Sequence, residues 1–182
     1  QAVQAALGHA QLLHEHGLFI GIVQLGNVCL QLGADGQALA AFFIGQGSLR
    51  EKALGYSDAA PTKEQMDIMQ KDLIEAMEAG YLGVSSGLVY APSVYASTEE
   101  LIELVKVMKP YGGIYASHIR GEGDNVLRSV QEAIRIGEEG GAPVLISHLK
   151  VMGKHNEGTS RLLLREIDDA NARGTTVWAD QY

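Results

Sequence analysis

A chain of 182 residues, of which 46% are hydrophobic, has the size and composition of one ordinary globular domain. Its formal net charge of −8, few aromatic residues and lack of a basic patch argue against nucleic acid as a partner, and no apolar run approaches a membrane span or a leader peptide. The single cysteine, Cys29, excludes an internal disulfide framework, so we expect a reducing, cytoplasmic compartment.

Residues 1–37 give the weakest signals and are interpreted as a separate N-terminal segment of helix and strand. A helix is predicted over residues 1–16, and it ends in His14-Glu15-His16. This triplet has the form of a His-x-His metal pair, but residues two apart on a helix do not share a face. We therefore expect His14 and His16 at the surface, far from any metal centre. Residues 18–24 predict a strand.

From residue 38 onward, apolar strands alternate with helices. Residues 40–44 predict a buried strand, and the Gly-rich residues 45–48 after it are interpreted as a plain turn. A helix is predicted over 63–79, where Thr62 and Gln65 match a capping box. A short strand over 81–84 then leads into a loop of small residues, 85–92. This loop could hold a substrate or be an ordinary strand–helix connection.

The same pattern of an apolar strand followed by Ser-His-aliphatic-basic then occurs twice. It comprises Ser117-His118-Ile119-Arg120 and Ser147-His148-Leu149-Lys150. A helical pattern over residues 124–139 separates the two copies, which makes a βαβ unit with parallel strands. Further helices over 99–108 and 160–173 and a final strand over 175–180 continue the alternation. A period of about thirty residues predicts a parallel sheet or part of an α/β barrel.

His118 and His148 are thus predicted at the carboxyl ends of consecutive parallel strands, where α/β proteins bind ligands. A lone histidine after an apolar run is more often structural. Two histidines at equivalent positions, each followed by a basic residue, favour a metal site instead. Neutral imidazole is a common zinc ligand, and adjacent strands lie less than about 5 Å apart. We therefore expect the two rings to converge.

Five segments carry a resemblance to a known family. They are AAFFIGQGSLREKALGY, GYLGVSSGLVYAPSVYASTEEL, YGGIYASHIRGEG, PVLISHLKVMG and VWADQY. Together they resemble the central part of the N-acyl-D-amino-acid deacylases (D-aminoacylases), which are metal-dependent (β/α)₈ enzymes of the amidohydrolase superfamily. The resemblance covers residues 38–182. It implies an α/β fold that is a partial (β/α)₈ TIM barrel, about strands three to seven.

The resemblance also implies roles for individual residues. The family's metal-binding histidines at strands five and six fall on His118 and His148, and the implied cofactor is zinc. Its substrate-holding groups fall on Tyr90, Arg120, Lys150 and Tyr182. The two basic groups would hold the carboxylate of a small N-acyl amino acid. The family's other metal ligands and its strand-eight aspartate have no counterpart, so no catalytic base is assigned.

The sequence is accordingly interpreted as a fragment of a zinc-dependent hydrolase that cleaves the amide bond of N-acyl-D-amino acids. One alternative is a non-catalytic, truncated barrel fragment that keeps the histidines without enough ligands to work. Its open sheet edges would favour an oligomer or association with the remainder of a barrel. Another alternative is a different amidohydrolase, dihydroorotase-like or deaminase-like. Neither nucleic acid nor membrane is expected as a partner.

Overall fold

The computed structural model of the protein describes residues 23–25, 28–32 and 38–181. Its strands are β1 (Val23–Leu25), β2 (Val28–Leu32), β3 (Ala38–Gly45), β4 (Gly83–Gly87), β5 (Ile114–His118), β6 (Val144–Ile146) and β7 (Val177–Ala179). Its helices are α2 (Gln46–Leu54), α3 (Lys63–Glu78), α4 (Thr98–Met108), α5 (Val126–Gly140) and α6 (Ser160–Ala172). Three short 3₁₀ turns are η1 (Ser93–Tyr95), η2 (Lys109–Tyr111) and η3 (Lys154–Asn156).

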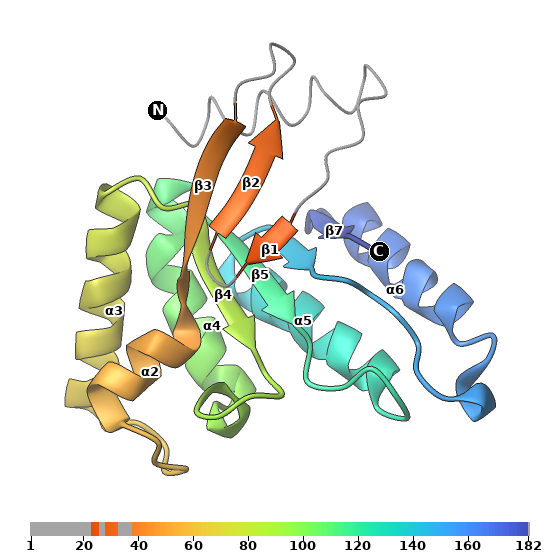
Figure 1. The fold of residues 1–182 in the computed structure, drawn as a ribbon, viewed down its shortest axis with the longest axis horizontal. Coiled ribbons are helices and arrows are strands. Elements are labelled where there is room, and N and C mark those ends of the chain that lie inside the picture. The colour runs from red at the N-terminus through yellow and green to blue at the C-terminus, as the bar shows by residue number, and fades with distance from the viewer. Residues whose placement is uncertain (1–22, 26–27, 33–37, 182) are drawn as a thin grey trace.

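The strands form one sheet in the order of the chain, β1 to β7. The β1–β2 and β2–β3 pairs are antiparallel, whereas β3 to β7 are all parallel. Figure 1 shows α3, α4, α5 and α6 on one side of the curved parallel part. Five parallel strands joined by helices are consistent with part of a barrel, so the predicted fold class is confirmed.

The core lies between the parallel strands and these helices. One row of strand residues in register across the sheet is almost fully buried, namely Val84, Tyr115, Val144 and Val177. Leu73 of α3, Leu104 of α4 and Val130 of α5 belong to the same cluster. The next row points to the opposite face because side chains alternate along a strand. Its last member, Trp178, is 42% exposed. Within the part of the chain described, no helix has the length and apolar character to span a bilayer.

Two details of the predicted elements are wrong. The turn predicted at residues 45–48 is instead the end of β3 at Gly45 followed directly by α2. The buried positions of α2 include Gln46 and Arg50, so this helix lacks the apolar periodicity that would have revealed it. The strand predicted to end at residue 84 continues to Gly87. Ser86 can be buried there because its hydroxyl lies 2.8 Å from that of Tyr115. The capping box of Thr62 and Gln65 is confirmed.

Gly83 is expected to be one of the least replaceable residues of the sheet. Its φ is +151°, and a Cβ here would overlap the backbone of Ile114 on β5, lying 2.7 Å from the nitrogen. Gly80 is a matched control, since its φ is also positive but a Cβ would meet nothing within 4 Å. Gly80→Ala should cost only the backbone strain of about 1–3 kcal/mol. Gly83→Ala should cost about 2 kcal/mol more in urea unfolding. Equal costs would show that β4 and β5 do not approach this closely.

Candidate metal centre

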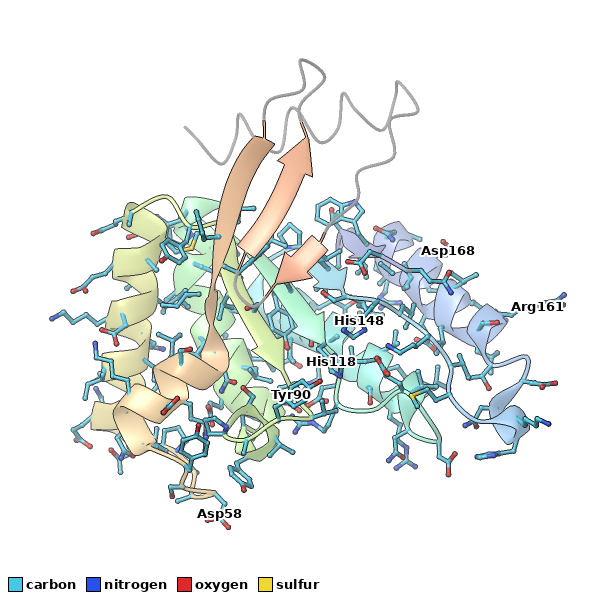
Figure 2. All side chains as sticks on the ribbon, viewed as in Figure 1. Asp58, Tyr90, His118, His148, Arg161 and Asp168 are labelled. Carbon is cyan, nitrogen blue, oxygen red and sulfur yellow. The ribbon has the colours of Figure 1, made fainter. Side chains whose placement is uncertain are left out.

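The two predicted histidines meet at the carboxyl ends of adjacent parallel strands. His118 is the last residue of β5, and His148 follows β6 by two residues. Nδ1 of His118 lies 2.7 Å from Nε2 of His148, and the ring centroids are 4.4 Å apart. Figure 2 shows the two side chains together with Tyr90 near these strand ends. The predicted convergence of the rings is therefore confirmed, while their role as metal ligands stays a prediction.

His148 is held by an unusual backbone conformation. Its φ is +43°, in the left-handed region that non-glycine residues rarely adopt outside turns and functional sites. The end of β7 stabilises this turn, because the Asp180 carboxylate accepts a hydrogen bond from the His148 backbone N–H. The Asp180 carbonyl also accepts from the N–H of Leu149 at 2.8 Å. The sequence predicts only a strand at Asp180, since nothing local reveals a partner 32 residues away.

A carboxylate that sequence analysis missed, Glu122, completes the polar cluster. Its Oε1 accepts from the Lys150 ammonium at 2.6 Å and lies 3.1 Å from Nδ1 of His148. The Glu122 side chain is only 11% exposed. Three side chains each offer one atom that could bind a metal, and these atoms lie within 4.8 Å of one another. The three residues are His118, Glu122 and His148. The available signal was an acidic residue between two glycines, four positions after the first histidine.

The surroundings favour neutral imidazole at His118. Burial lowers its pKa below the ordinary value of 6.5, and nearby His148 lowers it further, against the opposing effect of Glu122. The neutral ring is the form that binds a metal. Two nitrogens bound to one tetrahedral zinc lie roughly 3.3 Å apart, given Zn–N bonds of about 2.0–2.1 Å. The observed pair, 2.7 Å apart, would have to separate by only about 0.6 Å, so this donor set fits zinc.

A cavity of about 550 Å³ opens onto the two rings. Its described lining is rich in glycine and hydroxyl groups: Gly45, Gly47, Ser48, Glu51, Tyr56, Ser85, Ser86, Gly87, Tyr90, Ala91, Pro92, Ser93, His118 and His148. The Tyr90 ring is 5.5 Å from that of His118, and Tyr90 is 64% exposed. The predicted substrate residue Tyr90 thus borders both the cavity and the histidine pair.

The two predicted basic contacts have different partners. The Arg120 guanidinium pairs with Glu132 of α5 and donates to the carbonyls of Val94 and Ala96 at 3.0 and 2.9 Å. Lys150 contacts Glu122 and His148 instead. Neither basic residue is among the described residues that line the cavity. Their role in holding a substrate stays a prediction.

Other predicted positions fall where the structure gives no description. His14, His16 and the predicted substrate contact Tyr182 lie outside the described residues. Their predicted roles are therefore untested. Cys29 lies in β2, which pairs with β3. In the sequence, Cys29 precedes both His118 and His148 by many residues.

Comparisons with known proteins give consistent results, although no family model matches the chain. A D-aminoacylase from Alcaligenes xylosoxydans xylosoxydans is 42% identical over 134 residues, 74% of this chain and 28% of the relative. An N-acyl-D-glutamate deacylase from the same organism is 33% identical over 181 residues, which is 36% of its length.

Two solved structures match the described fold. The N-acyl-D-glutamate deacylase of Bordetella bronchiseptica, complexed with zinc and a phosphonate inhibitor that mimics the tetrahedral intermediate, has a TM-score of 0.76 and 39% identity. It is matched over 78% of this chain and 30% of that structure. A D-aminoacylase that defines a novel subset of amidohydrolases has a TM-score of 0.73 and 38% identity, over 77% of this chain and 29% of that structure.

The described residues therefore form part of an amidohydrolase-type α/β barrel. Within this class, the chain is a homologue of the D-aminoacylases and N-acyl-D-glutamate deacylases. The resemblance found in the sequence is confirmed. The chain spans about a third or less of these relatives, 36% of one and 28% of the other.

Proposed function

We propose that this chain supplies strands three to seven and two metal-binding imidazoles, His118 and His148, to a zinc-dependent hydrolase of N-acyl-D-amino acids. One observation carries the proposal: ring nitrogens 2.7 Å apart at the carboxyl ends of neighbouring parallel strands, facing a cavity. The zinc complex of a 39% identical deacylase supports the choice of metal. The single cysteine supports a cytoplasmic location.

Each residue of the site has a distinct task in this proposal. His118 and His148 would hold zinc, which when bound polarises an amide carbonyl and makes water a stronger nucleophile. Tyr90 offers a phenolic hydroxyl at the cavity wall. Lys150, Arg120 and Tyr182 are the proposed contacts for the substrate carboxylate. Arg120 would first have to release Glu132, to which it is now bound.

The remainder of the barrel is the partner that we propose for the open part of the sheet. The relatives extend well beyond the matched region, since the chain covers 28% of one and 36% of the other. A zinc site in a hydrolase needs about three protein ligands as well as an open position. Further ligands would come from those other strands.

A chimera with the D-aminoacylase provides the test, because 134 residues of it align with this chain. The aligned region would be replaced by the corresponding residues of this chain, and zinc content and hydrolysis of N-acyl-D-amino acids would be measured. We expect zinc binding and hydrolysis, both reduced at least about 100-fold by His118→Ala or His148→Ala. His155→Ala changes an exposed histidine outside the cavity and should have little effect.

The chimera tests the proposed deacylase activity and the proposed metal centre separately. A folded chimera that binds zinc stoichiometrically yet hydrolyses none of the substrates would overturn the deacylase assignment. A folded chimera whose zinc content is unaffected by both histidine substitutions would overturn the metal centre. Circular dichroism of every variant establishes folding before either comparison is made.

A further inference from the structure

We propose that Glu122 is a positioning residue that fixes the tautomer and orientation of His148, and that it does not share the metal ion with the two histidines. The inference rests on the proposed metal centre and deepens it. Glu122, His118 and His148 lie close enough to suggest three ligands of one ion. The individual contacts point to a different arrangement.

The two nitrogens of His148 face different partners. Nε2 faces Nδ1 of His118 at 2.7 Å, whereas Nδ1 faces Glu122 at 3.1 Å. The lone-pair directions of the two imidazole nitrogens diverge, so a single ion can be bound through only one of them. An ion held between His118 and His148 therefore lies on the side of the ring away from the Glu122 contact. This arrangement is typical of carboxylates that orient metal-binding histidines.

Glu122 also decides which nitrogen of His148 carries the proton. An ionised carboxylate can only accept, so a hydrogen bond across the 3.1 Å contact would place the proton on Nδ1 and leave the Nε2 lone pair directed at His118. The Lys150 ammonium, 3.1 Å from the same Nδ1, can only donate and would favour the opposite tautomer. Glu122 opposes this effect by accepting from Lys150 at 2.6 Å. The carboxylate thus keeps Nε2 available to a metal.

The loop that carries Glu122 is well anchored. The Glu122 carbonyl accepts from the Met152 backbone N–H at 2.7 Å, which joins the loops after β5 and β6. The next residue is also held, because the Gly123 carbonyl accepts from the Val126 N–H at 2.9 Å, at the start of α5. These two bonds restrain the backbone that carries the carboxylate beside the His148 ring. A positioning group needs this support, because a loosely held one would not select a ring orientation.

Two substitutions distinguish the roles. Glu122→Met removes the acceptor at similar length, whereas Glu122→Gln keeps an oxygen that can accept from Nδ1–H but loses the charge that engages Lys150. In the metal-free chimera, ¹⁵N NMR of labelled histidine should show the Nδ1–H tautomer of His148 and its loss in Glu122→Met. Zinc affinity, from chelator competition, should fall about 10–100-fold in Glu122→Met and less in Glu122→Gln. Glu157→Gln, an exposed control nearby, should change neither.

Cobalt substitution supplies the decisive readout. If Glu122 only positions His148, the visible spectrum of the cobalt form should keep its shape and intensity in Glu122→Met at saturating metal. A changed spectrum with an unchanged His148 tautomer would overturn the proposal and make Glu122 a ligand. Unchanged tautomer and affinity would also overturn it. Failure of the parent chimera to bind any metal would instead refute the proposed function, while the metal-free tautomer would still test Glu122.

Discussion

The isolated 182-residue chain, supplied with zinc, is expected to hydrolyse N-acyl-D-amino acids at no measurable rate. Its described residues supply two converging imidazoles, whereas catalytic zinc sites use about three protein ligands and an open position. Two imidazoles should leave the site mostly empty at ordinary zinc concentrations. Hydrolysis also needs a general base that accepts a proton from the attacking water, and no residue of this chain is assigned that role.

The assay would use several N-acyl-D-amino acids and compare the chain with its His118→Ala and His148→Ala variants. Circular dichroism must first show that all three are folded. Turnover in the parent chain that disappears in both variants would contradict the expectation, and it would mean that the chain holds a complete centre. Turnover that survives both substitutions would indicate a contaminating enzyme. Addition of the region of a D-aminoacylase outside the aligned 134 residues, as a separate polypeptide, would test whether it confers activity.

Replacing Glu100 by alanine should destabilise the protein by about 3–5 kcal/mol. The side chains of Arg50 and Glu100 are 0% and 2% exposed, and they form an ion pair between α2 and α4. Gln46 donates to the same carboxylate at 3.0 Å, and Arg50 also donates to the Ala59 carbonyl at 2.6 Å. Removal of Glu100 leaves a buried guanidinium without its counter-charge. Urea unfolding followed by circular dichroism measures the loss.

Two control variants show whether the loss of stability comes from the buried ion pair. Glu103→Ala, on the same helix, removes a half-exposed carboxylate paired with Lys106 and should cost about 0–1 kcal/mol. The double variant Arg50→Met with Glu100→Leu should be more stable than Glu100→Ala, because no unpaired charge remains buried. If Glu100→Ala and Glu103→Ala prove equally mild, water must reach the Arg50 guanidinium and the ion pair is not truly buried.

The parts of the fold that sequence predicted are those with a local signal. The helices α3, α4, α5 and α6 carry apolar residues at helical spacing, and the strands β5 and β6 are short apolar runs. The helix α2 escaped prediction because its buried positions include the polar residues Gln46 and Arg50, which both contact Glu100 of α4, about fifty residues further along the chain. The extension of β4 escaped for a similar reason, since Ser86 is stabilised by Tyr115 of the next strand.

The same distinction applies to the candidate site. His118 and His148 could be found because each follows an apolar strand, and parallel strands bring such positions together. Glu122 lies in a loop, and its contact with His148 forms only because the chain after β6 places that ring beside it. Asp180 acts on the His148 backbone from the following strand. The ion pair of Arg120 with Glu132 of α5 could not be predicted either, because it joins residues that only the folded chain brings together.

The left-handed backbone of His148 has a consequence for protein engineering. His118 is fixed by the regular ladder between β4 and β5, so its position cannot be altered without disturbing the sheet. His148 stands beyond the ladder, on a turn secured by Asp180. Residues that tolerate this backbone, such as asparagine and glycine, can replace it with the turn intact, whereas β-branched residues would distort it. With His148 kept, changes at its neighbours in this turn should therefore alter the spacing of the two rings while the barrel strands stay unchanged.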